Sequence, residues 1–135
     1  MSRKSFLTVV SIIALGVGPF ALLAPATLLA SKGVAPSEAA DVWVREVGIA
    51  IVAIGVATFL LRGHGDSPTL RVFLVGNAIL QGGLFPIELV AFAPGVITRA
   101  WGVVPNSVLH VLLAGGFVYF AARIRPEAAS GIASG

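Results

Sequence analysis

Residues 70–93 read "LRVFLVGNAILQGGLFPIELVAFA". The stretch is long enough to cross a bilayer, because about 20 helical residues span the hydrocarbon core. It nevertheless contains Asn77, Gln81, Pro86 and Glu88. A membrane helix that carries polar side chains turns them toward protein or water. This stretch therefore predicts a transmembrane helix that packs within a bundle.

The whole chain has the composition of a membrane protein. Of its 135 residues, 57% are hydrophobic and 11% are charged, roughly half the charged fraction of a soluble domain, and the mean hydropathy is +0.99. Apolar runs predict spans at about residues 6–30, 46–62, 70–93 and 105–123. We expect an all-α fold, in which residues 1–125 form a single antiparallel four-helix transmembrane bundle and residues 126–135 form a disordered tail.

The first predicted span, residues 6–30, resembles a secretory signal peptide in two respects. It follows the basic residues Arg3 and Lys4, and small residues lie near its end. Its apolar run is, however, far longer than the roughly 7–15 residues of a signal core. We therefore expect a helix that is retained, with a kink near Gly16, Gly18 and Pro19.

Basic residues are divided unequally between the two sides of the predicted bundle. The side with both termini carries Arg3, Lys4, Arg62, Arg71, Arg123 and Arg125, and the other side carries Lys32, Arg45 and Arg99. Cytoplasmic segments of membrane proteins are enriched in Lys and Arg. The asymmetry predicts that both termini are cytoplasmic. The apolar runs predict a multi-pass membrane protein, and we expect it in the cell (inner) membrane.

Several classes of function are disfavoured by the sequence. The chain contains no cysteine and no long basic run, so disulfides and thiolate metal sites are excluded and no nucleic-acid partner is expected. His64 and His110 fall on opposite sides of the predicted membrane, which excludes a metal site shared by both. No nucleophile elbow, phosphate loop or dinucleotide fingerprint is present. We therefore predict no catalytic residue, no metal and no cofactor.

A polar pocket is predicted in the half of the bundle away from the termini. Asn77, Gln81 and Glu88 fall within about 40° of one another on one helix face, and Glu88 lies about 10 Å beyond the middle of its span. Polar residues of the second and fourth spans reach the same depth. The predicted pocket residues are Arg45, Glu46, Asn77, Gln81, Glu88, Asn106 and His110.

Glu88 is expected to face the bundle interior and to pair with Arg45 or His110. An unpaired charge at membrane depth is unfavourable, so a carboxylate there needs a partner or a proton. Two interpretations of the pocket stay open at this point. Its residues either fix the packing of the helices or take part in a function.

Three stretches carry a resemblance to a known family. They are "LLAPATLLASKGV" at 22–34, "VREVGIAIVAIGV" at 44–56 and "GNAILQGGLF" at 76–85. Over about residues 6–122 the chain resembles the small DoxX-like four-helix membrane proteins. The resemblance implies a four-helix bundle, and some members look like membrane subunits of quinone-linked oxidoreductase complexes. Arg45 and Gly48 match a recurrent position of such families.

Three functions are compatible with these features. The first is a non-catalytic subunit or binding module whose bundle holds an amphiphile, such as a lipid or a quinone, or a partner membrane helix, including a second copy. The second is a small enzyme in which Glu88 and His110 act as acid and base on an apolar substrate. The third is an oligomer that conducts protons or solutes, which is disfavoured because the polar face fades beyond Asn77. The first function requires the fewest assumptions and is the one we expect.

Overall fold

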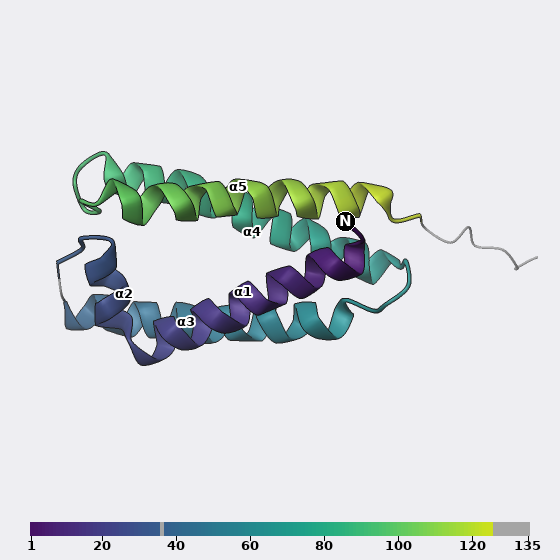
Figure 1. Ribbon diagram of the computed structural model, residues 1–135, viewed down its shortest axis with the longest axis horizontal. Coiled ribbons are helices and arrows are strands. Elements are labelled where there is room, and N and C mark those ends of the chain that lie inside the picture. Colours follow the sequence, from purple (N-terminus) through teal and green to yellow (C-terminus); the bar gives the residue numbers. More distant parts are fainter. Residues whose placement is uncertain (36, 126–135) are drawn as a thin grey trace, which may run out of the picture.

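The computed structural model describes residues 1–35 and 37–125, so the predicted disordered tail lies outside the described residues. Within the described ranges the chain is helical and contains no strand. The helices are α1 (Arg3–Leu23), α2 (Pro25–Ser31), α3 (Glu38–Leu61), α4 (Pro68–Phe92) and α5 (Ala100–Arg123), as Figure 1 shows. α1, α3, α4 and α5 are each long and apolar enough to cross a membrane. The prediction of an all-α chain with four candidate spans is thus confirmed.

The first predicted span is wrong as a single helix over residues 6–30. α1 continues through Pro19 but ends at Leu23, and Ala24 has a non-helical backbone with φ −133° and ψ 53°. A second helix, α2, begins at Pro25. Proline disfavours the helical conformation in the residue before it and suits the first position of a new helix. Pro25 thus separates a long helix from a short one of 7 residues.

The other long helices begin before their predicted spans, and local capping explains two of these starts. The hydroxyl of Ser37 accepts a hydrogen bond from the backbone N–H of Ala40 at 3.4 Å. The hydroxyl of Ser67 accepts one from the N–H of Leu70 at 3.1 Å. A serine in this position satisfies one of the unpaired amides of a helix start. α5 begins at Ala100, so Pro105 lies inside the helix instead of starting it.

The long helices pack as two pairs, and the first pair is α1 with α3. Glycines allow the close approach: a Cβ atom on Gly48 would lie 2.8 Å from the backbone nitrogen of Leu22. Gly18 faces Gly48, and Leu15 faces Gly55, so the two helices run in opposite directions. Small residues at such crossings let two membrane helices bring their backbones into contact.

The second pair is α4 with α5, and it meets the first pair where both ends of the described chain lie. The core cluster there contains Phe6, Leu7 and Val10 of α1, Leu70 and Leu74 of α4, Leu113, Phe117 and Ala121 of α5, and Ile124 after it. The Phe6 ring packs edge-on against the Phe117 ring, with centroids 5.1 Å apart. This cluster is the apolar core of the protein, and the end of the molecule that contains it is called the core end below.

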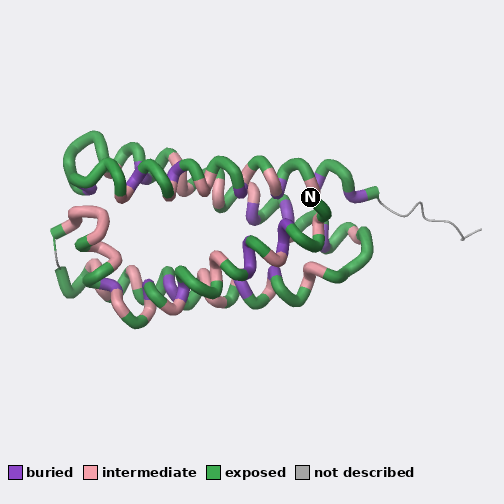
Figure 2. The backbone as a smooth tube through the Cα atoms, in the orientation of Figure 1, coloured by how far each residue is buried: buried purple, intermediate pink, exposed green. Residues whose placement is uncertain are grey.

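Near the middle of the long helices, the two pairs bury few side chains against each other. In α1, the buried residues beyond Ser11 are Gly18 and Ala21, and both lie against Gly48 of α3. α4 has no buried residue between Asn77 and Glu88, and this whole helix is described. Figure 2 shows exposed and half-buried colours along the facing middle parts of the pairs. The pairs are therefore joined mainly near their two ends.

A polar latch closes the core end. Arg3 forms an ion pair with Asp66 of the loop between α3 and α4, and it also donates to the backbone carbonyl of His64 at 2.7 Å. The backbone N–H of Arg125 donates to the second oxygen of Asp66 at 3.3 Å. One loop carboxylate thus holds the beginning of α1 and the segment that follows α5.

Candidate functional site

The end of the molecule opposite the core end is organised by a polar network. Its members come from three different elements, and each is buried or half-buried. They are Lys32 after α2, Gln81 and Glu88 of α4, and Asn106, Ser107 and His110 of α5. The network crosses from one helix pair to the other, since Lys32 belongs to the α1–α2–α3 half.

Glu88 is the centre of this network. Its Oε1 accepts hydrogen bonds from the Lys32 ammonium at 2.5 Å and from the Asn106 amide at 2.5 Å. Its Oε2 accepts a hydrogen bond from the Ser107 hydroxyl at 3.0 Å. Both carboxylate oxygens are therefore occupied, and the negative charge is balanced by one lysine, as a buried ionised group requires.

Two local features bring Lys32 to Glu88. The break at Ala24 turns α2 toward α4 and α5, and the backbone N–H of Arg99 donates to the Lys32 carbonyl at 3.2 Å. Gly102 near the start of α5 leaves room for this approach, because a Cβ atom there would lie 2.9 Å from the Lys32 Cα. The position of the cation therefore depends on the turn after α2 and on a glycine of α5.

The hydrogen bonds of His110 define its tautomer. Asn106 has two amide hydrogens, and its nitrogen lies 2.5 Å from Glu88 Oε1 and 3.1 Å from His110 Nε2. An amide nitrogen only donates, so Nε2 accepts. His110 Nδ1 then carries the hydrogen and donates to the Gln81 carbonyl oxygen at 2.6 Å. The imidazole is thus neutral and joins Asn106 to Gln81.

Two polar groups at the inner edge of the network have unused hydrogen-bonding capacity. His110 uses the carbonyl oxygen of Gln81, so the amide nitrogen of Gln81 remains able to donate. One turn away, Asn77 is 7% exposed and donates its amide to the Phe73 carbonyl. Its own side-chain oxygen is buried without a hydrogen-bond partner among the described residues. A donor and an acceptor therefore lie one turn apart, close to the middle of α4.

The structure brings together four of the seven residues predicted for the pocket, with a fifth, Asn77, one turn away. Gln81, Glu88, Asn106 and His110 belong to the network, whereas Arg45 and Glu46 are exposed on α3. The expected partner of Glu88 is corrected. The carboxylate pairs with Lys32 rather than with Arg45 or His110, and Asn106 separates it from the imidazole.

Sequence reasoning missed Lys32 and Ser107. A single span over residues 6–30 puts Lys32 in an external loop, whereas Pro25 is the signal that the helix breaks there. Ser107 directly follows Asn106, but a serine in an apolar helix commonly bonds its own backbone and gives no distinct pattern.

The network is built from one ion pair and from hydrogen bonds between amide, hydroxyl and imidazole groups. Among the described residues, no group of three or more His, Cys, Asp or Glu is placed to hold a metal ion. The groups with unused capacity at the inner edge of the network include the amide nitrogen of Gln81 and the side-chain oxygen of Asn77. Comparisons of the chain with protein-family models, with curated proteins and with solved structures give no match.

Proposed function

We propose that this chain is a small non-catalytic membrane protein that binds an amphiphile between its two helix pairs. The observation that carries the proposal is the side-chain oxygen of Asn77, which is buried without a hydrogen-bond partner among the described residues. It lies one turn from Gln81, whose oxygen is used by His110 and whose amide nitrogen can donate. A buried acceptor without a partner is unfavourable by about 1–3 kcal/mol. A head group that both donates and accepts would satisfy it.

The depth of these two groups favours an amphiphile over a water-soluble ligand. α4 spans Pro68–Phe92, so Gln81 lies near its middle and Glu88 lies about 10 Å nearer one end, at 1.5 Å per residue. A ligand at this depth enters sideways from the lipid. At mid-length the facing helices bury few residues against each other, and this is where the proposal places the apolar chain. A quinone or a lipid with a hydroxyl group has the required head and tail.

The proposal includes the orientation of the bundle. The four long helices form an antiparallel transmembrane bundle in the cell (inner) membrane, with the core end and both termini in the cytoplasm, supported by the excess of basic residues there. Reporter fusions to Gly135 and to the 95–100 loop test this orientation. A cytoplasmic signal from the 95–100 loop would contradict it. We also propose that the chain is a DoxX-like four-helix membrane protein.

Binding can be tested with two probes on the purified full chain. Native mass spectrometry would measure retention of a short-chain benzoquinol and of a diacylglycerol. We expect at least one probe to bind, and Asn77→Leu and Gln81→Leu to weaken it about tenfold each, since each removes a hydrogen bond worth about 1–1.5 kcal/mol. Thr58→Val is the matched control, because Thr58 is buried and polar but bonds its own helix. Equal retention by all variants, or no retention by the unmodified chain, would contradict the proposal.

The same experiment distinguishes an enzyme from a binding protein. A linear chain of contacts from Glu88 through Asn106 to His110 favours acid–base chemistry as a second candidate. Both oxygens of Glu88, however, already accept hydrogen bonds, from Lys32, Asn106 and Ser107. We therefore expect Glu88→Gln to retain the bound probe. If the unmodified chain converts a bound probe into a product and Glu88→Gln does not, the result would support an enzyme instead.

A helix of a partner membrane protein is the third candidate for binding at the mid-length region. A membrane protein that co-purifies in fixed ratio, and whose loss follows Gln81→Leu but not Thr58→Val, would identify the chain as a subunit instead of an amphiphile-binding module. If the partner is a second copy of this chain, the measured oligomeric mass would fall in Gln81→Leu but not in Thr58→Val.

A further inference from the structure

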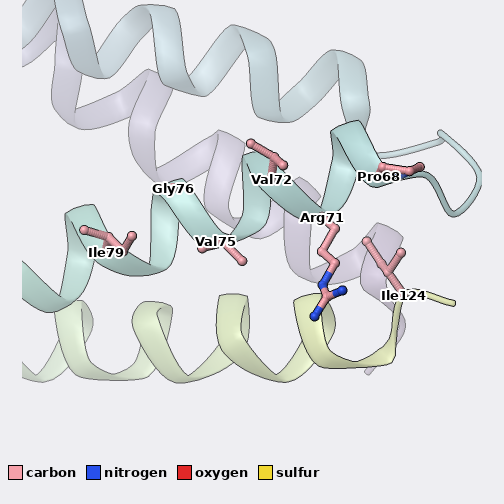
Figure 3. A pocket seen from close by; sticks show the side chains of 7 residues that line it. All are labelled: Pro68, Arg71, Val72, Val75, Gly76, Ile79 and Ile124. Atoms are coloured by element: carbon pink, nitrogen blue, oxygen red, sulfur yellow. The ribbon is translucent and has the colours of Figure 1, made fainter. Parts of the chain in front are cut away.

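An apolar groove begins at the core end and extends along α4 as far as Ile79. It has a volume of about 600 Å³ and lies along α4, with Ile124 after α5 at its end. Figure 3 shows the residues that line it, among them Pro68, Arg71, Val72, Val75 and Ile79. All of these except Arg71 are apolar. The groove therefore combines one cationic group with a hydrocarbon surface.

Arg71 differs from neighbouring arginines in its contacts. Arg3 is paired with Asp66. The guanidinium of Arg62 stacks on Phe59, 3.4 Å from the ring centroid. No carboxylate in residues 1–35 and 37–125 forms an ion pair with Arg71, and its side chain extends from α4 toward the end of α5 in Figure 3. Arg71 is thus a cation that lines the groove and has no ion-pair partner among those residues.

The length of the groove matches one leaflet of a bilayer. Arg71 and Ile79 are separated by eight residues, about 12 Å along a helix. Half of the hydrocarbon core measures about 15 Å. Arg71 lies in the first turn of α4, at the level of the lipid head groups if the helix crosses the membrane. An acyl chain from that level would run along Val75 toward Ile79.

We propose that this groove binds an anionic phospholipid of the leaflet at the core end. The guanidinium of Arg71 binds the phosphate, which planar N–H donors recognise well, and one acyl chain lies along α4. The excess of basic residues at this end attracts anionic lipid to the same region. This site is separate from the proposed amphiphile site, and neither depends on the other.

The test uses the full chain in detergent with phosphatidylglycerol and phosphatidylcholine of identical acyl chains. Native mass spectrometry would measure the bound fraction of each lipid. We expect phosphatidylglycerol to bind more tightly, and Arg71→Gln to weaken it about fivefold, the effect of one basic residue near an anionic lipid surface. Arg71→Lys keeps the charge and should retain most of the binding. Arg62→Gln is the matched control, since it removes the same charge at the same end.

A second variant tests the groove rather than the charge. A Cβ atom on Gly76 would meet no atom within 4 Å, so a side chain can start there, and we expect Gly76→Leu to occupy the groove. It should weaken both lipids, whereas Gly115→Leu, equally unobstructed on α5, should not. The proposal is overturned if both lipids bind equally, if Arg62→Gln matches Arg71→Gln, or if Gly76→Leu has no effect. Circular dichroism and gel filtration would verify that each variant is folded.

Discussion

The two ends of this molecule join the same helix pairs by different chemistry. At the core end, Phe6 and Phe117 pack edge-on within an apolar cluster. At the other end, Lys32 and Glu88 form an ion pair. In a bilayer, burial of apolar surface between helices brings little hydrophobic gain, because lipid tails are equally apolar. The core end is therefore stabilised by the close packing of side chains. The other end is stabilised by the ion pair between Lys32 and Glu88.

This difference predicts that packing defects are most harmful at the core end. Phe117 is fully buried, so Phe117→Ala leaves a cavity and should lower the free energy of unfolding by about 3 kcal/mol. Phe92→Ala is the control, because Phe92 is 39% exposed. Reversible unfolding in mixed detergent micelles would measure both. Similar losses for the two variants would remove the distinction between the ends.

The second prediction concerns the charge pair at the polar end. Lys32→Met leaves Glu88 buried without its cation and should lower the free energy of unfolding by about 2 kcal/mol, less than for a fully buried pair because the site lies away from the membrane centre. Glu88→Gln added to Lys32→Met should restore most of the loss, since no charge is then left unpaired. Arg99→Met provides an exposed control. Absence of rescue in the double variant would show that packing of Lys32, not its charge, joins the pairs.

The smallest effect is expected from the latch that closes the core end. The hydrogen bond from Arg3, aided by the backbone N–H of Arg125, lowers the pKa of Asp66 below its ordinary value of 3.8. Because the folded-state pKa is depressed, the contribution is fully present above pH 3.8 and is lost as pH falls through the lower folded-state value.

Proteolysis of the loop between α3 and α4 measures this effect. Cleavage by an acid protease should accelerate at the lowest pH values that the bundle survives, and Asp66→Asn should make cleavage fast at all pH values. A pH profile that Asp66→Asn leaves unchanged would show that another group titrates. The latch would then add nothing to the packing at the core end.

Particular residues show how far the sequence could be interpreted. The face shared by Gln81 and Glu88 follows from helical periodicity alone, and both residues do belong to one network. Arg45 was predicted to join them because its depth matched, yet it lies exposed on α3. Depth along a span is a local property, whereas the direction in which a helix faces depends on its neighbours.

The sequence by itself determined four long apolar helices and the order of polar groups along them, because length, hydropathy and helical periodicity are properties of contiguous residues. Only the tertiary structure decided which cation forms the ion pair with Glu88. That choice depends on the helix break before Pro25 and on the close approach of Gly102 to Lys32. Lys32 and Glu88 are 56 residues apart, and no local pattern records a contact over that distance.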